Sequence, residues 1–149
     1  MRVFRFIAVL ALSGLITPAL AAPLSGRQFE AAFIGGAPVS NEKAPTLAFE
    51  GTQASGNGGC NQFSATATDR GRVTVERRKR KPSLRIAKGP LRIGSVSSTR
   101  MYCGPGSAQE ARFFDLLGKT RSYRMRTSEL RLYSGGRRPR LLMVLRAAD

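Results

Sequence analysis

Gly56-Asn57-Gly58-Gly59-Cys60-Asn61-Gln62-Phe63 is the stretch that decides the fold, together with the distant segment Ser98-Thr99-Arg100-Met101-Tyr102-Cys103. Each stretch carries one of the two cysteines in the chain. The first is a glycine-dense turn that leads into alternating apolar and polar residues, and the second leads towards a predicted helix. We expect Cys60 and Cys103 to form one disulfide, with two independent buried thiols as the alternative.

The N-terminus has the features of a secretory signal peptide. Arg2 and Arg5 precede an apolar run over residues 6–16, and Ala19-Leu20-Ala21 fits the small-x-small pattern of a signal-peptidase site. The run is shorter than the roughly 20 apolar residues that a spanning helix needs, although a membrane anchor is the alternative. We expect a signal peptide over 1–21 with cleavage after Ala21, one domain over 22–149 without a transmembrane span, and a periplasmic or secreted protein.

This compartment bears on the chemistry of the two cysteines. Outside the cytoplasm a lone pair of cysteines is more often bonded than free, and closing so long a loop would stabilise the fold by up to about 4 kcal/mol. The chain has no histidine, so two cysteines cannot complete the four ligands of a closed zinc site. We expect no metal and no cofactor.

Positive charge is the other strong feature of the composition. The chain has 25 Lys and Arg residues against 9 Asp and Glu, a net charge of +16. Such an excess favours contact with the phosphates of nucleic acid, lipopolysaccharide or phospholipid, or with an acidic protein. A solubilising surface is the simpler alternative.

The charge is densest in a run of five cations followed by a proline. Because neighbouring like charges repel and cannot be buried, we expect a protruding, mobile basic loop over 77–90. No aromatic residue lies between Asp69 and Met101, which argues against base stacking on single strands. The candidate anion-binding residues are Arg77, Arg78, Lys79, Arg80, Lys81, Arg85, Lys88 and Arg92.

Alternating apolar residues predict strands over 46–50, 61–68, 73–75, 122–126 and 129–133, and an apolar run predicts a central strand over 141–145. Residues 27–34 fit a strand better than a short helix, and 51–59 are expected to form a loop. Residues 84–86 and 91–93 predict two short strands split by Lys88-Gly89-Pro90. Ser107 and Glu110 have the spacing of a capping box, which predicts a helix over 108–117 that ends at Gly118 and buries Ala111, Phe113, Phe114 and Leu117.

Together these segments resemble the META domain, or HslJ-like, family. The resemblance rests on Gly59-Cys60-Asn61 and Phe63, on Thr99, Met101 and Cys103, and on the aromatic helix and the strands that follow. It implies an α+β fold in which an antiparallel sheet curls into an open, barrel-like shape with one main helix packed against it. Gly59, Asn61, Thr99 and Met101 would form its structural motif, with Asn61 satisfying backbone groups left open by the glycine turn.

The resemblance also implies a compartment rather than a reaction. Family members are typically envelope or secreted proteins associated with heat or envelope stress and antibiotic tolerance, and no enzymatic activity is established for them. Two features of this chain depart from the family pattern. Phe29 stands where a tryptophan is common, and the basic segment from Arg77 is longer than usual.

The residues themselves nominate no catalytic centre. The chain offers no histidine as a general base, and its carboxylates are scattered without a paired motif. We therefore expect a non-enzymatic envelope protein, and as the alternative a polyanion-binding module that uses the basic loop. Its partner is not identified by the sequence: an anionic envelope component and another envelope protein are the candidates. A small apolar ligand near Phe63 and Phe114, inside the open barrel, is a third hypothesis.

Overall fold

A computed structural model describes residues 22–39, 43–79 and 81–148. The predicted signal peptide over 1–21 and the predicted cation Arg80 lie outside the described residues. Within the described part, no helix has both the length and the apolar character that crossing a membrane requires.

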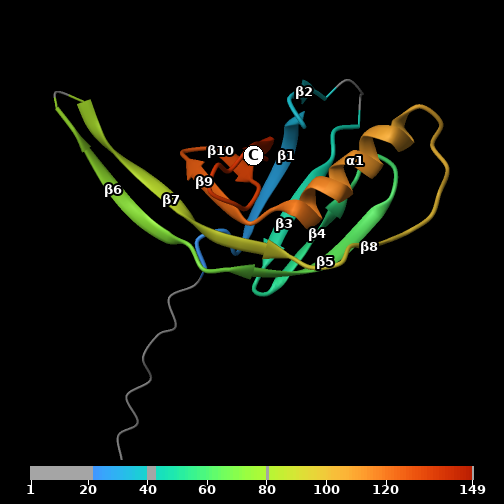
Figure 1. Cartoon of the computed structure of the whole chain (residues 1–149), viewed down its shortest axis with the longest axis horizontal. Coiled ribbons are helices and arrows are strands. Elements are labelled where there is room, and N and C mark those ends of the chain that lie inside the picture. The colour runs from blue at the N-terminus through green and yellow to red at the C-terminus, as the bar shows by residue number, and fades with distance from the viewer. Residues whose placement is uncertain (1–21, 40–42, 80, 149) are drawn as a thin grey trace, which may run out of the picture.

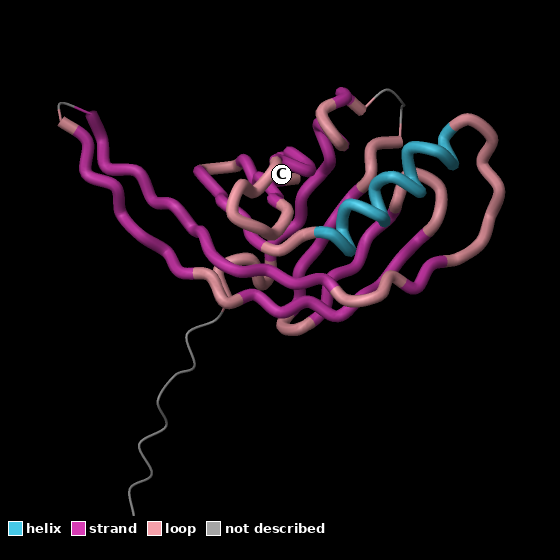
Figure 2. Tube along the Cα trace, viewed as in Figure 1, coloured by secondary structure: helices cyan, strands magenta, loops and turns pink. Residues whose placement is uncertain are grey.

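The described residues form one helix and eleven strands, all of whose pairings are antiparallel (Figures 1 and 2). The strands before the helix are β1 (Arg27–Ile34), β2 (Ala37–Pro38), β3 (Thr46–Glu50), β4 (Gln53–Asn57), β5 (Gln62–Asp69), β6 (Arg72–Arg78), β7 (Lys81–Ile93) and β8 (Ser97–Ser98). The helix α1 (Gly106–Lys119) follows, and then β9 (Ser122–Arg126), β10 (Glu129–Tyr133) and β11 (Leu141–Ala147).

Eight of the strands form a closed barrel. Their order is β7-β9-β10-β11-β1-β3-β4-β5, and β5 pairs back with β7 through Ala67 and Ile93. The predicted α+β class, the antiparallel sheet and the single helix are confirmed, but the expected opening in the barrel is wrong. Closure satisfies the backbone groups of both would-be edge strands, which an open sheet would leave without partners.

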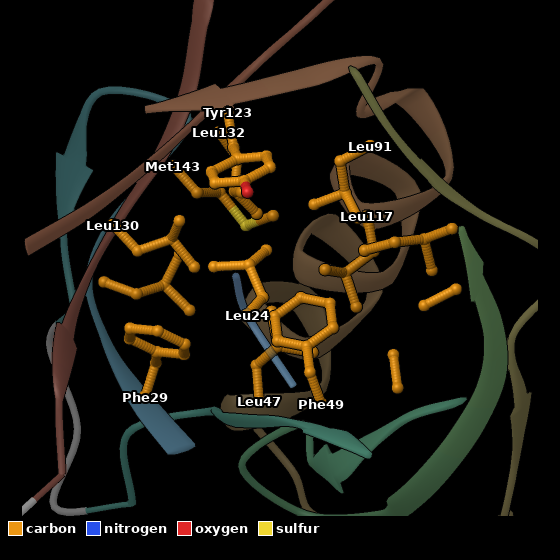
Figure 3. Packing of buried hydrophobic residues seen from close by; sticks show 14 of the residues in the cluster. Leu24, Phe29, Leu47, Phe49, Leu91, Leu117, Tyr123, Leu130, Leu132 and Met143 are labelled. Carbon is orange, nitrogen blue, oxygen red and sulfur yellow. The ribbon is translucent and has the colours of Figure 1, made fainter. Parts of the chain in front are cut away.

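The interior of the barrel is filled by side chains, as expected for eight strands. Buried residues alternate along the strands: Phe63, Ala65 and Ala67 face inward on β5, and Leu130 and Leu132 do so on β10. Figure 3 shows the labelled core residues converging from several strands and, through Leu117, from the helix, with Leu24 from the N-terminal turn in their midst. These buried residues form one continuous core cluster.

Helix α1 packs against this core, but its boundaries and buried face differ from the prediction. It is longer at both ends than 108–117, and Gly118 lies inside it. Its buried side chains are Glu110, Phe113, Leu116 and Leu117, whereas Ala111 is exposed. Because a turn takes 3.6 residues, this set forms the continuous stripe at i, i+3, i+6 and i+7 that packs against the sheet.

The aromatic residues expected around a ligand pack against one another. The ring of Phe63 lies edge-on to that of Phe113 at 5.8 Å and to that of Phe114 at 5.3 Å between centroids. Such edge-to-face contacts belong to a packed aromatic cluster. Phe63 is thus a core residue, and Phe114 is partly buried against the core with its ring in contact with that of Phe63.

Two predicted loops are strands. Residues 53–57, expected in a loop, form β4, and Gly56 is where the strand crosses close to β3: a Cβ there would collide with the carbonyl of Thr46. Close approach of two backbones is one of the reasons for which a strand carries glycine. The basic loop predicted over 77–90 is wrong as well, since β6 and β7 form a long hairpin (Figure 1).

The predicted break at Lys88-Gly89-Pro90 is also absent, because β7 runs without interruption for 13 residues. The Gly-Pro pair lies where β7 changes its neighbour: residues 81–88 pair with β6, and residues 91–93 pair with β5. Pro90 has no backbone N–H to donate, and it lies between the segments of β7 that pair with β6 and with β5, where neither partner strand needs that hydrogen bond. The other edge of β7 continues through this point, with Gly89 opposite Tyr123 and Pro90 opposite Ser122 of β9.

Candidate functional site

The first site brings the two quoted segments together through the predicted disulfide. Cys60 and Cys103 are bonded, with their Cα atoms 6.0 Å apart and 43 positions between them in sequence. Cys60 lies in the turn before β5, and Cys103 lies just before α1. The bond therefore ties the barrel wall to the segment that leads into the helix.

Asn61 reinforces the same connection with hydrogen bonds. Its Oδ1 accepts from the hydroxyl of Thr99 at 2.8 Å and from the backbone N–H of Met101 at 2.7 Å. Its Nδ2 donates to the carbonyl of Met101 at 3.1 Å and to Oε2 of Glu110 at 2.7 Å. Asn61 is 5% exposed, so the structure pairs all four hydrogen-bonding positions of a buried amide.

The expected role of Asn61 needs one correction. Its side chain does bind backbone groups, but they belong to Met101 rather than to the glycine turn. The turn is closed by other contacts: Asn57 Oδ1 accepts from the N–H of Gly59 at 2.7 Å, and the Asn61 carbonyl accepts from the N–H of Gly58 at 2.8 Å. Gly59 itself has a φ of 110°, a conformation that favours glycine.

Glu110 is not the capping residue predicted from its spacing to Ser107. The helix begins at Gly106, its N-cap is Pro105, and no side chain caps it. Instead, Oε1 of Glu110 accepts from the backbone N–H groups of Cys60 at 3.2 Å and Asn61 at 2.6 Å. Glu110 is 6% exposed and, among the described residues, forms no ion pair, so its charge is held by N–H donors alone.

These contacts define the Asn61–Glu110 brace, which comprises Asn61, Thr99, Met101 and Glu110. The brace joins three elements that are remote in sequence: the start of β5, the segment after β8 and the first half of α1. Both carboxylate oxygens of Glu110 and the whole side-chain amide of Asn61 are hydrogen-bonded in this network. The brace therefore connects these segments.

The predicted cations lie along the β6–β7 hairpin rather than in one cluster. Arg77 and Lys79 lie near its tip, Arg85 lies on β7, and Lys88 lies at its base; all four are exposed. Arg78 and Lys81 are backbone partners in the register of the hairpin. Arg92 is separate from this group, because it lies in the barrel wall opposite Thr68.

We call the β6–β7 hairpin from its base at Arg72 and Lys88 to its tip the arm (Figure 1). Residues 86–88 of β7 still pair with β9, and the part nearer the tip extends beyond the barrel. The four ion pairs recorded among the described residues use Lys119, Arg124, Arg126 and Arg131, so none of them neutralises a cation of the arm. Glu76, a carboxylate within the arm, is bound by Arg124 at 2.9 Å. Arg77, Lys79 and Arg85 of the arm therefore present their positive charge to solvent.

Sequence reasoning missed two cations at the base of the arm. Arg70 and Arg72 are exposed, and together with Lys88 they line a hollow of about 700 Å³. Arg72, Thr74 and Glu76 are polar residues at every second position, a pattern typical of a strand that places these three side chains on one face. This pattern could have indicated where Arg72 lies.

Tyr123 lies at the inner wall of this hollow. Its hydroxyl donates to Oδ2 of Asp69 at 3.3 Å, and the same carboxylate accepts from the backbone N–H groups of Leu24 and Gly71. Burial in the first place, and the negative charge of Asp69 in the second, raise the pKa of Tyr123 well above its usual range. Tyr123 is therefore a neutral, fixed part of the wall.

The comparisons with known proteins give one result. A family model described as META domain matches residues 22–148. No curated protein and no solved structure matches the chain. The matched range contains the disulfide, the Asn61–Glu110 brace, the arm and every strand of the barrel, and a chain matched over nearly its whole length in this way belongs to the META domain family.

Proposed function

We propose that this protein is an exported, non-enzymatic META-domain envelope protein, related to HslJ-like proteins, whose arm binds polyanions. The observation that carries the proposal is the arm itself, a projecting hairpin with exposed cations that no carboxylate of the described residues neutralises. A surface of this kind attracts phosphate-rich partners such as lipopolysaccharide, anionic lipid or DNA. Among these, an envelope component matches the expected compartment.

The absence of catalysis is supported by two features. The chain has no histidine to serve as a general base. The buried carboxylate of Glu110 is held by three N–H groups and is directed away from solvent. A proton-transfer role requires a group that can reach substrate, which this geometry denies.

Export is supported by the leader pattern and by the disulfide, because such bonds persist in oxidising compartments. Fractionation of cells that produce the full chain tests it. We expect the mature protein in the periplasmic or secreted fraction, with an N-terminus at Ala22. Protein retained in the cytoplasm with Cys60 and Cys103 reduced would contradict this part of the proposal.

The expected link to heat or envelope stress and antibiotic tolerance follows from family membership alone. It is tested by deleting the gene and measuring survival after heat and after a membrane-active antibiotic. We expect reduced survival, restored by the wild-type gene. Equal survival of the deleted strain under both stresses would remove the link without affecting the binding proposal.

Polyanion binding is tested on the arm directly. The variant R77E/K79E/R85E reverses three exposed cations, and its binding to lipopolysaccharide and to anionic vesicles is measured by co-sedimentation at low and high salt. We expect wild-type binding that weakens as salt rises, because screening acts on exposed charges. The variant is expected to lose binding at both salt concentrations.

The matched control changes the same amount of charge elsewhere. R137E/R138E/R140E alters three exposed arginines in the turn between β10 and β11. If binding depends on the arm, this control keeps most of it. Equal losses in both variants would show that only net charge matters, and unchanged binding by the arm variant would show that the arm is not the binding surface.

A further inference from the structure

A row of four cations crosses the outer face of the sheet. Arg72 on β6 lies directly opposite Lys88 on β7, Lys88 lies opposite Arg124 on β9, and Arg124 lies opposite Arg131 on β10. Residues directly opposite each other share one face, and like charges in such positions destabilise a sheet. Their neighbours Ala87 and Met125 are buried, so the row lies on the outside of the barrel.

Only half of this row is neutralised. Arg124 binds Oε1 of Glu76 at 2.9 Å, and Arg131 binds Oε1 of Glu129 at 2.6 Å. Arg72 and Lys88 form no ion pair with any described residue. The unfavourable contact between like charges is therefore concentrated at the β6–β7 end of the row.

That end of the row forms the rim of the hollow at the base of the arm. The hollow has a volume of about 700 Å³, within the ~300–1,000 Å³ range of small-molecule sites. Between its cations the wall is mostly apolar, and no carboxylate lines it. Its lining residues are Arg70, Arg72, Thr74, Lys88, Gly89, Pro90, Ser122 and Tyr123.

A neighbouring hollow of about 160 Å³ provides the contrast. It contains Arg124, Arg126 and Arg131, but it also contains Glu129, and all three arginines are paired with Glu76 or Glu129. An anion entering there would have to displace carboxylates already in place. The larger hollow demands no such exchange.

The carboxylate behind the larger hollow is occupied as well. Asp69 accepts hydrogen bonds from Leu24, Gly71 and Tyr123 at 3.1, 2.8 and 3.3 Å. Gly71 is needed for this arrangement, because a Cβ at that position would collide with the hydroxyl of Tyr123. Asp69 is thereby fixed on the inner side of the wall, and the cations of the rim remain free to bind an external anion.

We infer that the larger hollow is a binding site for a phosphate monoester carried by an apolar body. This inference rests on the proposed function of the arm and names the class of ligand. A phosphate monoester carries about −1.5 to −2 charges, which suits three cations, and the guanidinium groups of Arg70 and Arg72 can bind its oxygens in pairs. The apolar wall around Pro90 receives the adjoining part of the ligand.

The ligand test uses short-chain dihexanoyl phosphatidic acid, kept below its micelle concentration, with calorimetry on the mature, disulfide-bonded protein. We expect binding that is much tighter than that of inorganic phosphate or glucose 6-phosphate, which lack the apolar body. Dihexanoyl phosphatidylcholine, which has no net charge, is expected not to bind. Equal affinity for inorganic phosphate and the amphiphile would overturn the role of the apolar wall.

Variants assign the binding to this hollow. R72Q/K88Q is expected to weaken binding of the short-chain phosphatidic acid by about tenfold or more, since it removes charge-assisted hydrogen bonds to phosphate. R131Q, in the neutralised half of the same row, is the control and should change affinity by no more than about twofold. Similar losses in both variants would overturn the assignment.

Thermal melting supplies a second readout. Without ligand at low salt, K88Q is expected to melt above the wild type, because the substitution relieves repulsion from both Arg72 and Arg124. At the same concentration the ligand should raise the melting temperature of the wild type more than that of R72Q/K88Q. A lower melting temperature for K88Q, or an undiminished ligand shift in the double variant, would contradict the inference.

The outcome for the hollow can be separated from the outcome for the arm. If anionic vesicles bind through Arg77, Lys79 and Arg85 but the short-chain ligand does not bind at all, the arm proposal stands and the hollow inference is wrong. If the wild type binds neither, both are wrong. If the short-chain ligand binds and R77E/K79E/R85E keeps full vesicle binding, the hollow is a site and the surface formed by Arg77, Lys79 and Arg85 is not.

Discussion

Replacing Asn61 with alanine tests how the two remote segments are held together. The change removes four side-chain hydrogen bonds. Thr99 and Met101 are exposed, so water can take over most of their share, and the three bonds to them together cost at most about 1 kcal/mol. The bond to the carboxylate of Glu110, which is 6% exposed, is worth about 1.5–3 kcal/mol because it involves a charged group. The expected total is about 2–4 kcal/mol.

The loss is measured by urea unfolding of the mature, disulfide-bonded protein. A change of that size should lower the midpoint without altering the m-value, and it corresponds to about 10 °C in the melting temperature of a domain of this length. Asn57→Ala is the matched control. It removes the same amide from the same turn, where that amide accepts a hydrogen bond from the N–H of Gly59, so about 1 kcal/mol is expected.

Two results would refute this reasoning. A loss below about 1 kcal/mol for Asn61→Ala would mean that water satisfies Glu110 as well as Asn61 does. Equal losses for Asn61→Ala and Asn57→Ala would mean that the turn, rather than the connection to Glu110 and Met101, determines the cost. Either outcome would leave the disulfide as the principal link between the two segments.

Replacing Cys60 and Cys103 with serine should lower the free energy of unfolding by about 2–4 kcal/mol; a loss under 1 kcal/mol in urea would show that the brace alone holds the segments. Gly58→Ala should cost about 1–3 kcal/mol, because its Cβ would lie 2.6 Å from Oε1 of Glu110, and an unchanged melting temperature would contradict that packing. The raised pKa of Tyr123 has burial as its main cause. Because the folded protein holds this proton more tightly than the unfolded chain does, the contribution of Tyr123 to the free energy of unfolding is complete below the unfolded pKa of about 10. It is lost as pH rises above that value. Tyr123→Phe should flatten this decline in unfolding experiments at pH 9–11, and an equally steep decline in the variant would exclude this phenol as its source.

Much of the fold could be predicted because strands record burial directly in the sequence. The alternation of Phe63, Ala65 and Ala67 in sequence is the alternation of buried residues observed along β5. Turn residues and the two cysteines added long-range information that alternation lacks. Closure of the barrel could not be foreseen, because it depends on the register between β5 and β7, and neither strand encodes its partner.

The candidate site was harder to predict than the fold. The spacing of Ser107 and Glu110 fitted a local capping pattern, yet Glu110 binds the N–H groups of Cys60 and Asn61, which are some 50 residues away in sequence. A capping motif directs the carboxylate to the unpaired N–H groups at the start of its own helix. A tertiary contact can instead bring it unpaired N–H groups from a distant turn. Only the folded structure shows which set the carboxylate binds.

The basic run illustrates why charge density is a poor guide to secondary structure. Repulsion between neighbouring cations excludes burial, but it does not exclude a strand whose side chains project alternately into solvent on both faces. The exposed Arg77 and Arg85 meet that condition because β6 and β7 extend beyond the barrel. Nearer the barrel the same strand pairing brings cations together, because β7 pairs with both β6 and β9 and thereby places Lys88 between Arg72 and Arg124. Binding sites commonly contain groups that lower stability until a ligand is bound. We therefore expect selectivity at the base of the arm, where an anion would relieve the repulsion between cations, rather than at the more highly charged tip.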